Sequence, residues 1–118
     1  MLTKHIWVYD DDILVEEDLV MVLSEAGYSV QRKESDEISN YIKNPQGVDP
    51  ELIISNPTPL KVAVPINCPV IIISGHMPKY LPSSKDMVNG MILHKPFLPF
   101  QLKNAVRIIS ERTLTKVL

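Results

Sequence analysis

The chain has 118 residues, of which 45% are hydrophobic and 22% are charged. This length and composition predict one globular domain and exclude a two-domain or disordered chain. The formal net charge of −2 hides an acidic half, residues 1–51, and a basic half, residues 52–118. Because the Lys and Arg residues are scattered, the sequence indicates no direct nucleic-acid binding.

The cysteine count and the distribution of apolar residues indicate the cellular compartment in which the chain is expected. A single cysteine, Cys68, excludes an internal disulfide and suits a reducing environment. It stands before an apolar run, which favours a buried structural thiol over a nucleophile. Three aspartates at positions 10–12 argue against a signal peptide, and no apolar stretch approaches the roughly 18 residues of a membrane span. We therefore expect a cytoplasmic domain with no membrane segment.

Five predicted strands alternate with helices along the chain. Apolar runs without polar alternation are typical of strands covered on both faces, and apolar residues at helical spacing mark the helices. The predicted elements are a strand over His5–Tyr9, a helix over Val15–Ala26 closed by Gly27, a strand over Tyr28–Gln31, a helix capped by Ser35 that ends at residues 44–47, strands over Leu52–Ser55, Val70–Ser74 and Met91–His94, and a helix opened by Pro99.

This alternation predicts an α/β fold with a parallel sheet, right-handed crossovers and the flavodoxin-like strand order 2-1-3-4-5. Any site is expected at the carboxyl ends of the strands. The helix capped by Ser35 is predicted to bury Ile38, Tyr41 and Ile42. The helix opened by Pro99 is predicted to bury Leu102, Ala105, Val106 and Ile109.

Two connections are too rich in proline for full helices. Residues 57–69 include four prolines, so the third helix of the fold is missing or reduced to one turn within Leu60–Val64. Pro78 and Pro82 shorten the fourth helix to about Ser83–Asn89. One face of the sheet is then covered only thinly by residues 57–69, whose apolar side chains are Leu60, Val62, Val64 and Ile66. We expect apolar surface to stay exposed there and to serve for docking or dimerisation.

Several motifs, taken in order and spacing, carry a family resemblance. They are Trp7 to Asp12, Leu23 to Tyr28, Pro50 to Asn56, Pro69 to Gly75 and Lys95-Pro96-Phe97. Over nearly its whole length the chain resembles the response-regulator receiver domain (CheY-like), so residues 1–118 are interpreted as a single receiver-like domain.

The resemblance implies roles for particular residues. In receivers an acidic pair after the first strand helps hold Mg²⁺, and an aspartate after the third strand accepts phosphate from a histidine kinase. A hydroxyl and a lysine after the fourth and fifth strands contact the phosphoryl group. The matching positions here are Asp10, Asp11, Ser74 and Lys95, with Asn56 at the acceptor position.

The carboxamide at position 56 removes the chemistry that the resemblance implies. Asn56 has nearly the shape of aspartate but neither its charge nor its nucleophilicity, so no catalytic residue and no enzyme activity are expected. The family's aromatic switch position, three residues before the lysine, is Ile92. We therefore predict a degenerate, pseudo-receiver site.

Three interpretations of the acidic pair stay open: a solvated turn with Asp12 as a helix cap, a structural ion pair with Lys95, and a weak Mg²⁺ site at Asp10 and Asp11. Two carboxylates and one lysine leave a net charge of about −1, which predicts weak Mg²⁺ binding or none and no other cofactor. Ser74 is interpreted as a strand-end hydroxyl, and Lys95-Pro96 as a turn whose peptide bond is cis, as in the family.

The favoured function is a phosphorylation-independent interaction or regulatory module in two-component-type signal transduction. The expected partner is a protein such as a histidine kinase, an attached signalling domain or a second copy. The alternatives are an active phosphorelay receiver and a small-molecule-binding flavodoxin-like domain, although the four dispersed glycines form no phosphate cradle. Trp7 is interpreted as a core residue, and His76 and His94 as loop and strand-end residues.

Overall fold

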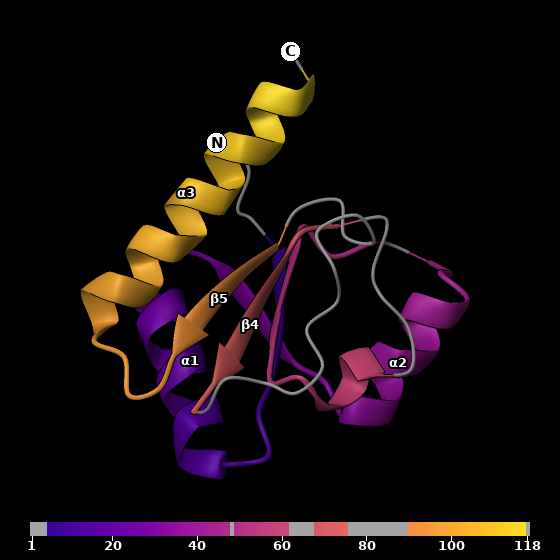
Figure 1. The fold of residues 1–118 in the computed structure, drawn as a ribbon, viewed down its shortest axis with the longest axis horizontal. Helices are drawn as coiled ribbons and strands as arrows, with labels where there is room; N and C mark the ends of the chain where they lie inside the picture. Colours follow the sequence, from indigo (N-terminus) through magenta and orange to yellow (C-terminus); the bar gives the residue numbers. More distant parts are fainter. Residues whose placement is uncertain (1–4, 48, 62–67, 76–89, 118) are drawn as a thin grey trace.

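The structure has a central five-stranded parallel sheet (Figure 1). The computed structural model describes residues 5–47, 49–61, 68–75 and 90–117. The strand order is β2-β1-β3-β4-β5, and every neighbouring pair is parallel, as predicted. In chain order the elements are β1 (His5–Tyr9), α1 (Ile13–Glu25), β2 (Ser29–Arg32), α2 (Ser35–Lys43), β3 (Leu52–Ser55), the 3₁₀ turn η1 (Thr58–Lys61), β4 (Val70–Ser74), β5 (Gly90–His94) and α3 (Pro99–Val117).

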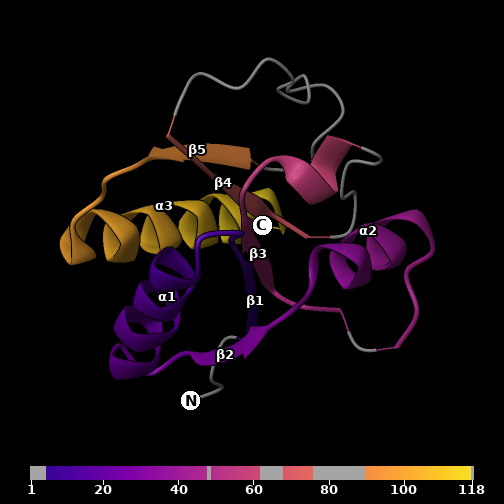
Figure 2. The same cartoon turned by 90° about the horizontal axis from the view of Figure 1, so that it is seen from below.

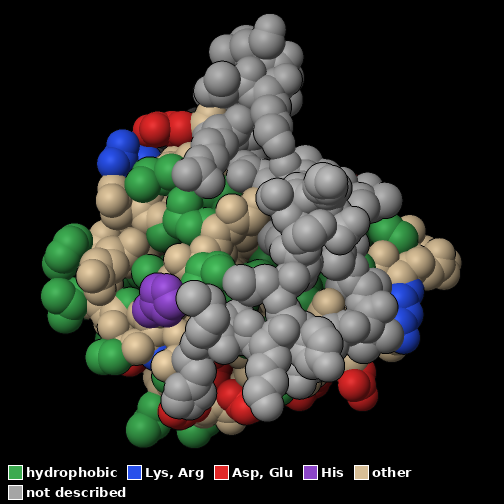
Figure 3. Space-filling view, viewed as in Figure 1, with side chains coloured by type: hydrophobic (Ala, Val, Ile, Leu, Met, Phe, Trp, Pro, Cys, Tyr) green, Lys and Arg blue, Asp and Glu red, His purple; other side chains and the backbone are tan. Residues whose placement is uncertain are grey.

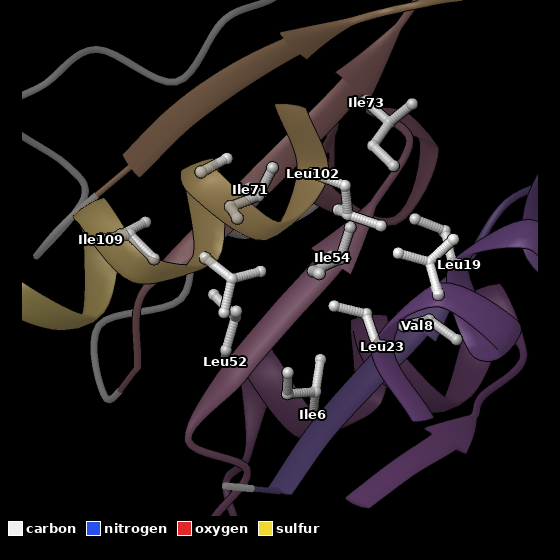
Figure 4. Packing of buried hydrophobic residues seen from close by; sticks show 13 residues of the cluster. Ile6, Val8, Leu19, Leu23, Leu52, Ile54, Ile71, Ile73, Leu102 and Ile109 are labelled. Atoms are coloured by element: carbon white, nitrogen blue, oxygen red, sulfur yellow. The ribbon is translucent and has the colours of Figure 1, made fainter. Parts of the chain in front are cut away.

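Helices cover both faces of the sheet. Figure 2 shows α1 and α3 on one face and α2 with η1 on the other. Because successive strand side chains point to opposite faces, each buried strand contributes to two cores. On the first face the apolar side chains of α1 and α3 pack against the sheet (Figure 4), with Ile6, Val8, Leu52, Ile54, Ile71 and Ile73 from the strands and Leu19, Leu23, Leu102 and Ile109 from the helices.

The second core lies under α2 and η1. It consists of Trp7, Ile38, Tyr41, Ile42, Ile53, Leu60, Cys68, Val70 and Ile72. Trp7 packs edge-on against Tyr41 with ring centroids 4.8 Å apart, and the Lys33 ammonium lies 4.7 Å from its ring centroid. Burial raises the pKa of Cys68 to about 12, so its thiol stays protonated. Trp7 and Cys68 are therefore the core residues that the sequence predicts.

Local hydrogen bonds set the ends of α1. Asp12 caps the helix by accepting a 3.0 Å hydrogen bond from the Leu14 N–H. At the other end Gly27 has a φ of 97°, and the Tyr28 N–H donates to the Leu23 carbonyl at 3.1 Å. Glycine adopts this left-handed conformation without strain, which ends α1 where predicted.

The predicted cap of α2 was wrong by one residue. Glu34, not Ser35, is the N-cap, because its side chain and that of Glu37 form a reciprocal capping box. The Glu34 N–H donates to Glu37 Oε1 at 3.0 Å. Strands β2 and β5 also differ by one residue, since β2 runs from Ser29 to Arg32 and β5 begins at Gly90.

The third helix of the fold is reduced to η1. This turn begins at Thr58, two residues before the predicted Leu60, because the Asn56 side chain accepts the Thr58 N–H at 3.1 Å. Leu60 is buried in the second core, where it covers the sheet. The other apolar residues of the covering segment, Val62, Val64 and Ile66, and the predicted helix Ser83–Asn89 lie outside the described residues, so the docking surface stays a prediction.

Among the described residues, no helix is both long and apolar enough to cross a membrane.

Candidate functional site

Four of the predicted site residues meet at the carboxyl edge of the sheet. Asp10 follows β1, Asn56 follows β3, Ser74 ends β4 and Lys95 follows β5. Backbone hydrogen bonds extend the ladders past the strand ends, from the Asn56 N–H to the Tyr9 carbonyl at 3.3 Å and from the Lys95 N–H to the Ser74 carbonyl at 2.9 Å. Parallel pairing therefore brings together residues that are up to 85 positions apart in sequence.

An ion pair joins the two sides of this edge. Lys95 Nζ lies 2.8 Å from Asp10 Oδ2, and the Asp10 side chain is 0% exposed while that of Lys95 is 24% exposed. Among the described residues, Oδ2 meets no donor at a good hydrogen-bond angle, but an ammonium at this distance makes a close charge contact. The second Asp10 oxygen, Oδ1, accepts the Asp12 N–H at 2.9 Å. Asp10 therefore forms the ion pair with Lys95, and the interpretation of Asp10 as part of a solvated turn was wrong. The interpretation as a weak Mg²⁺ site stays a prediction.

Burial raises the pKa of Asp10, and the contact with Lys95 partly opposes this rise. The neighbouring Asp11 is exposed and has the opposite shift. Hydrogen bonding with Asp10 is the main cause that lowers the pKa of Asp11. Slight burial opposes this shift, and hydrogen bonding with the Asn56 carboxamide adds to it. The two adjacent carboxylates thus differ in environment, one paired inside and one at the surface.

The Asn56 carboxamide is buried. Its oxygen accepts the Thr58 N–H at 3.1 Å. Asn56 Oδ1 and Asp10 Oδ1 each accept a backbone N–H, and Asp10 Oδ2 lies against the Lys95 ammonium. A Mg²⁺ ion, which needs oxygen ligands in near-octahedral geometry, would have to share these oxygens, and weak Mg²⁺ binding or none stays a prediction. Within the described part of the chain, no three His, Cys, Asp or Glu side chains are grouped so that they could hold a metal.

The other predicted positions are also placed. Ser74 is buried at the end of β4, and Ile92 lies half-buried in β5 opposite Ile72. The Lys95-Pro96 bond is cis, as the resemblance implies. His94 is exposed at the end of β5, whereas His76 lies outside the described residues.

The chain resembles several solved structures in its fold. The N-terminal domain of a response regulator/sensory box/GGDEF three-domain protein from Carboxydothermus hydrogenoformans is 15% identical, covers 98% of this chain and 100% of its own, and has a TM-score of 0.71. The receiver domain of the hybrid histidine kinase CckA is 23% identical, covers 86% of this chain and 94% of its own, and has a TM-score of 0.61. The Vibrio cholerae chemotaxis protein CheY4 is 18% identical, covers 92% of this chain and 99% of its own, and has a TM-score of 0.65.

The chain has the receiver fold. No protein-family model matches its sequence, and no curated protein matches it significantly. In this fold Asn56 is the buried residue directly after β3. The roles of Asp10, Asp11, Ser74, Lys95 and Ile92 in signalling stay predictions.

A residue that the sequence reasoning missed, Glu16, supports the site from α1. Although it is charged, Glu16 is buried. Glu16 Oε2 accepts the Asp10 N–H at 3.2 Å, and Oε1 lies 3.7 Å from Arg32 Nε of β2. The signal was its spacing, because Glu16 precedes the core residues Leu19 and Leu23 by three and seven positions and so shares their face of α1.

Proposed function

We propose that this chain is a receiver-fold module of two-component-type signalling that acts by protein contact and accepts no phosphoryl group. The observation that supports this most is Asn56 at the carboxyl end of β3, where an acceptor aspartate would stand. Phosphoryl transfer needs an anionic oxygen in line with the donor, with a metal ion to offset the developing charge. A carboxamide supplies no such nucleophile, so the fold is retained as a binding surface.

The surroundings of Asn56 support the same proposal. Lys95 is paired with the buried Asp10, and the Asn56 oxygen accepts a hydrogen bond from the start of the η1 turn. The lysine and the carboxamide are thus both engaged by groups of the same chain. Ile92 on β5 also supplies no aromatic ring for the rotamer change that relays phosphorylation in receivers.

The partner class follows from the proteins that share the fold. One is a receiver domain within a hybrid histidine kinase and another is the first domain of a three-domain regulator. We propose that this module likewise works next to a kinase or an attached signalling domain, as a regulatory contact and not as an enzyme.

Beryllofluoride with Mg²⁺ mimics a phosphoryl group on an acceptor aspartate and tests the proposal. The backbone amide NMR signals of Asp11, Asn56 and Lys95 are expected to stay unchanged when both reagents are added, because position 56 offers no carboxylate to bind them. The matched control is Asn56→Asp, which restores that carboxylate. Saturable shifts of these amides in the wild-type protein would instead support an active phosphorelay receiver.

A further inference from the structure

Exposed apolar side chains gather on one side of the molecule. Within the described residues, the large apolar side chains that are more than half exposed all belong to α1 or to the start of α3, namely Ile13, Leu14, Met21, Leu98 and Phe100. Figure 3 shows hydrophobic side chains at the edge where α3 begins. Exposed apolar side chains on two neighbouring helices indicate an interaction site more strongly than an isolated exposed leucine does.

The outer face of α1 is both apolar and acidic. Its exposed apolar residues alternate with the exposed acids Glu17, Asp18 and Glu25, and the helix contains no Lys or Arg. Ile13, Glu17 and Met21 follow one another at four-residue spacing, so they form a single stripe on the helix surface. This is the pattern of a helix that binds an apolar groove with a basic rim.

A groove with these properties lies beside α1, on the same face of the sheet. An open groove between the end of α1 and the first half of α3 is lined by Ala26, Tyr28, Phe100, Lys103, Asn104 and Arg107. Its apolar wall comes from Ala26, Tyr28 and Phe100, and its cations are Lys103 and Arg107. Among the described residues, Arg107 pairs with the exposed Glu111 of its own helix and with Asn104, and exposed pairs of this kind contribute little.

We propose that this groove binds the outer face of α1 from a second copy of the chain. The acidic, apolar helix face and the basic, apolar groove are complementary in charge and in polarity. The end of α1 helps to form the groove, so the outer face of the same α1 cannot enter it. A second copy can, and two such contacts related by a two-fold axis bury both surfaces at once.

The proposed partner for the interaction role given above is thus a second copy of the chain, and this inference rests on that role only in part. Dimerisation needs no chemistry at Asn56, so the dimer and the silent acceptor can fail separately. The contact is electrostatic at its rim, and its affinity is therefore expected to fall with rising salt concentration.

Sedimentation equilibrium of charge-reversed variants tests the inference. Glu17→Lys with Asp18→Lys in one protein, and Lys103→Glu with Arg107→Glu in another, are each expected to weaken dimerisation at least tenfold. An equal mixture of the two variants is expected to dimerise again, because each reversed helix then meets a reversed groove. Lys43→Glu on α2, which is exposed and far from the groove, is the matched control and is expected to dimerise like wild type.

Circular dichroism melting checks that each variant is folded. A wild-type protein that stays monomeric at millimolar concentration would overturn the inference and leave the face to a different protein. Dimers that survive both reversals would also overturn it, because they would form through another surface. Neither outcome would change the beryllofluoride result, so the two proposals are tested independently.

Discussion

Replacing Lys95 with methionine is expected to lower the free energy of unfolding at neutral pH by about 2–3 kcal/mol. The variant removes the ammonium that lies 2.8 Å from the fully buried Asp10 carboxylate and leaves that charge without its counter-ion. Loss of one partner from a fully buried pair costs about 3–5 kcal/mol. Because Lys95 is partly exposed to solvent, we expect a cost at or below the lower end of this range. Chemical denaturation at neutral pH measures the change.

The pH dependence separates this charge effect from a packing defect. Burial raises the folded pKa of Asp10, so its contribution to stability is present at low pH and is lost as the pH rises from the ordinary aspartate range through the folded pKa. Removing Lys95 raises that pKa further, so the loss caused by Lys95→Met should be small near about pH 4 and grow toward neutral pH. Adding Asp10→Asn to the variant should recover most of the stability. An equal loss at every pH would contradict the ion-pair interpretation.

Asn56→Asp is expected to create a Mg²⁺ site that the wild-type protein lacks. A third carboxylate beside Asp10 and Asp11 replaces a hydrogen bond with repulsion, which should cost about 1–3 kcal/mol of stability without metal at neutral pH. Mg²⁺ should then stabilise the variant, by roughly 1.4 kcal/mol at a concentration ten times its dissociation constant. Urea denaturation with and without Mg²⁺ measures both effects.

Asn56→Ala is the matched control, because it removes the carboxamide contacts without adding charge. It should lose stability and show no response to Mg²⁺. Stabilisation of the wild-type protein by Mg²⁺ to the same extent as Asn56→Asp would show that Asp10 and Asp11 are sufficient as ligands, and it would contradict the ion-pair account.

The sheet could be predicted from the sequence because its central strands are buried on both faces. Strands β1, β3 and β4 are continuous apolar runs between polar or proline-rich segments, and their predicted bounds are confirmed. The receiver resemblance grouped Asp10, Asn56, Ser74 and Lys95 in advance, and the parallel order of the strands explains why these residues lie at one edge of the sheet.

The details that were missed depend on tertiary contacts that periodicity alone does not specify. Sequence spacing did not distinguish a buried Asp10 from an exposed Asp11, because the loop after β1 follows no regular repeat. Glu34 caps α2 through its side chain, although serine at the next position is the commoner cap. Exposure of Ile13 and Leu14 on α1 became visible only when the orientation of the helix on the sheet was known.

The most direct test of the account is the intact mass of the protein after incubation with acetyl phosphate and Mg²⁺. With Asn56 at the end of β3, the wild-type chain is expected to keep its original mass under conditions that phosphorylate an active receiver domain. A hydroxylamine-sensitive gain of one phosphoryl group on the wild-type chain would contradict the account, because it would show that an acceptor carboxylate is present.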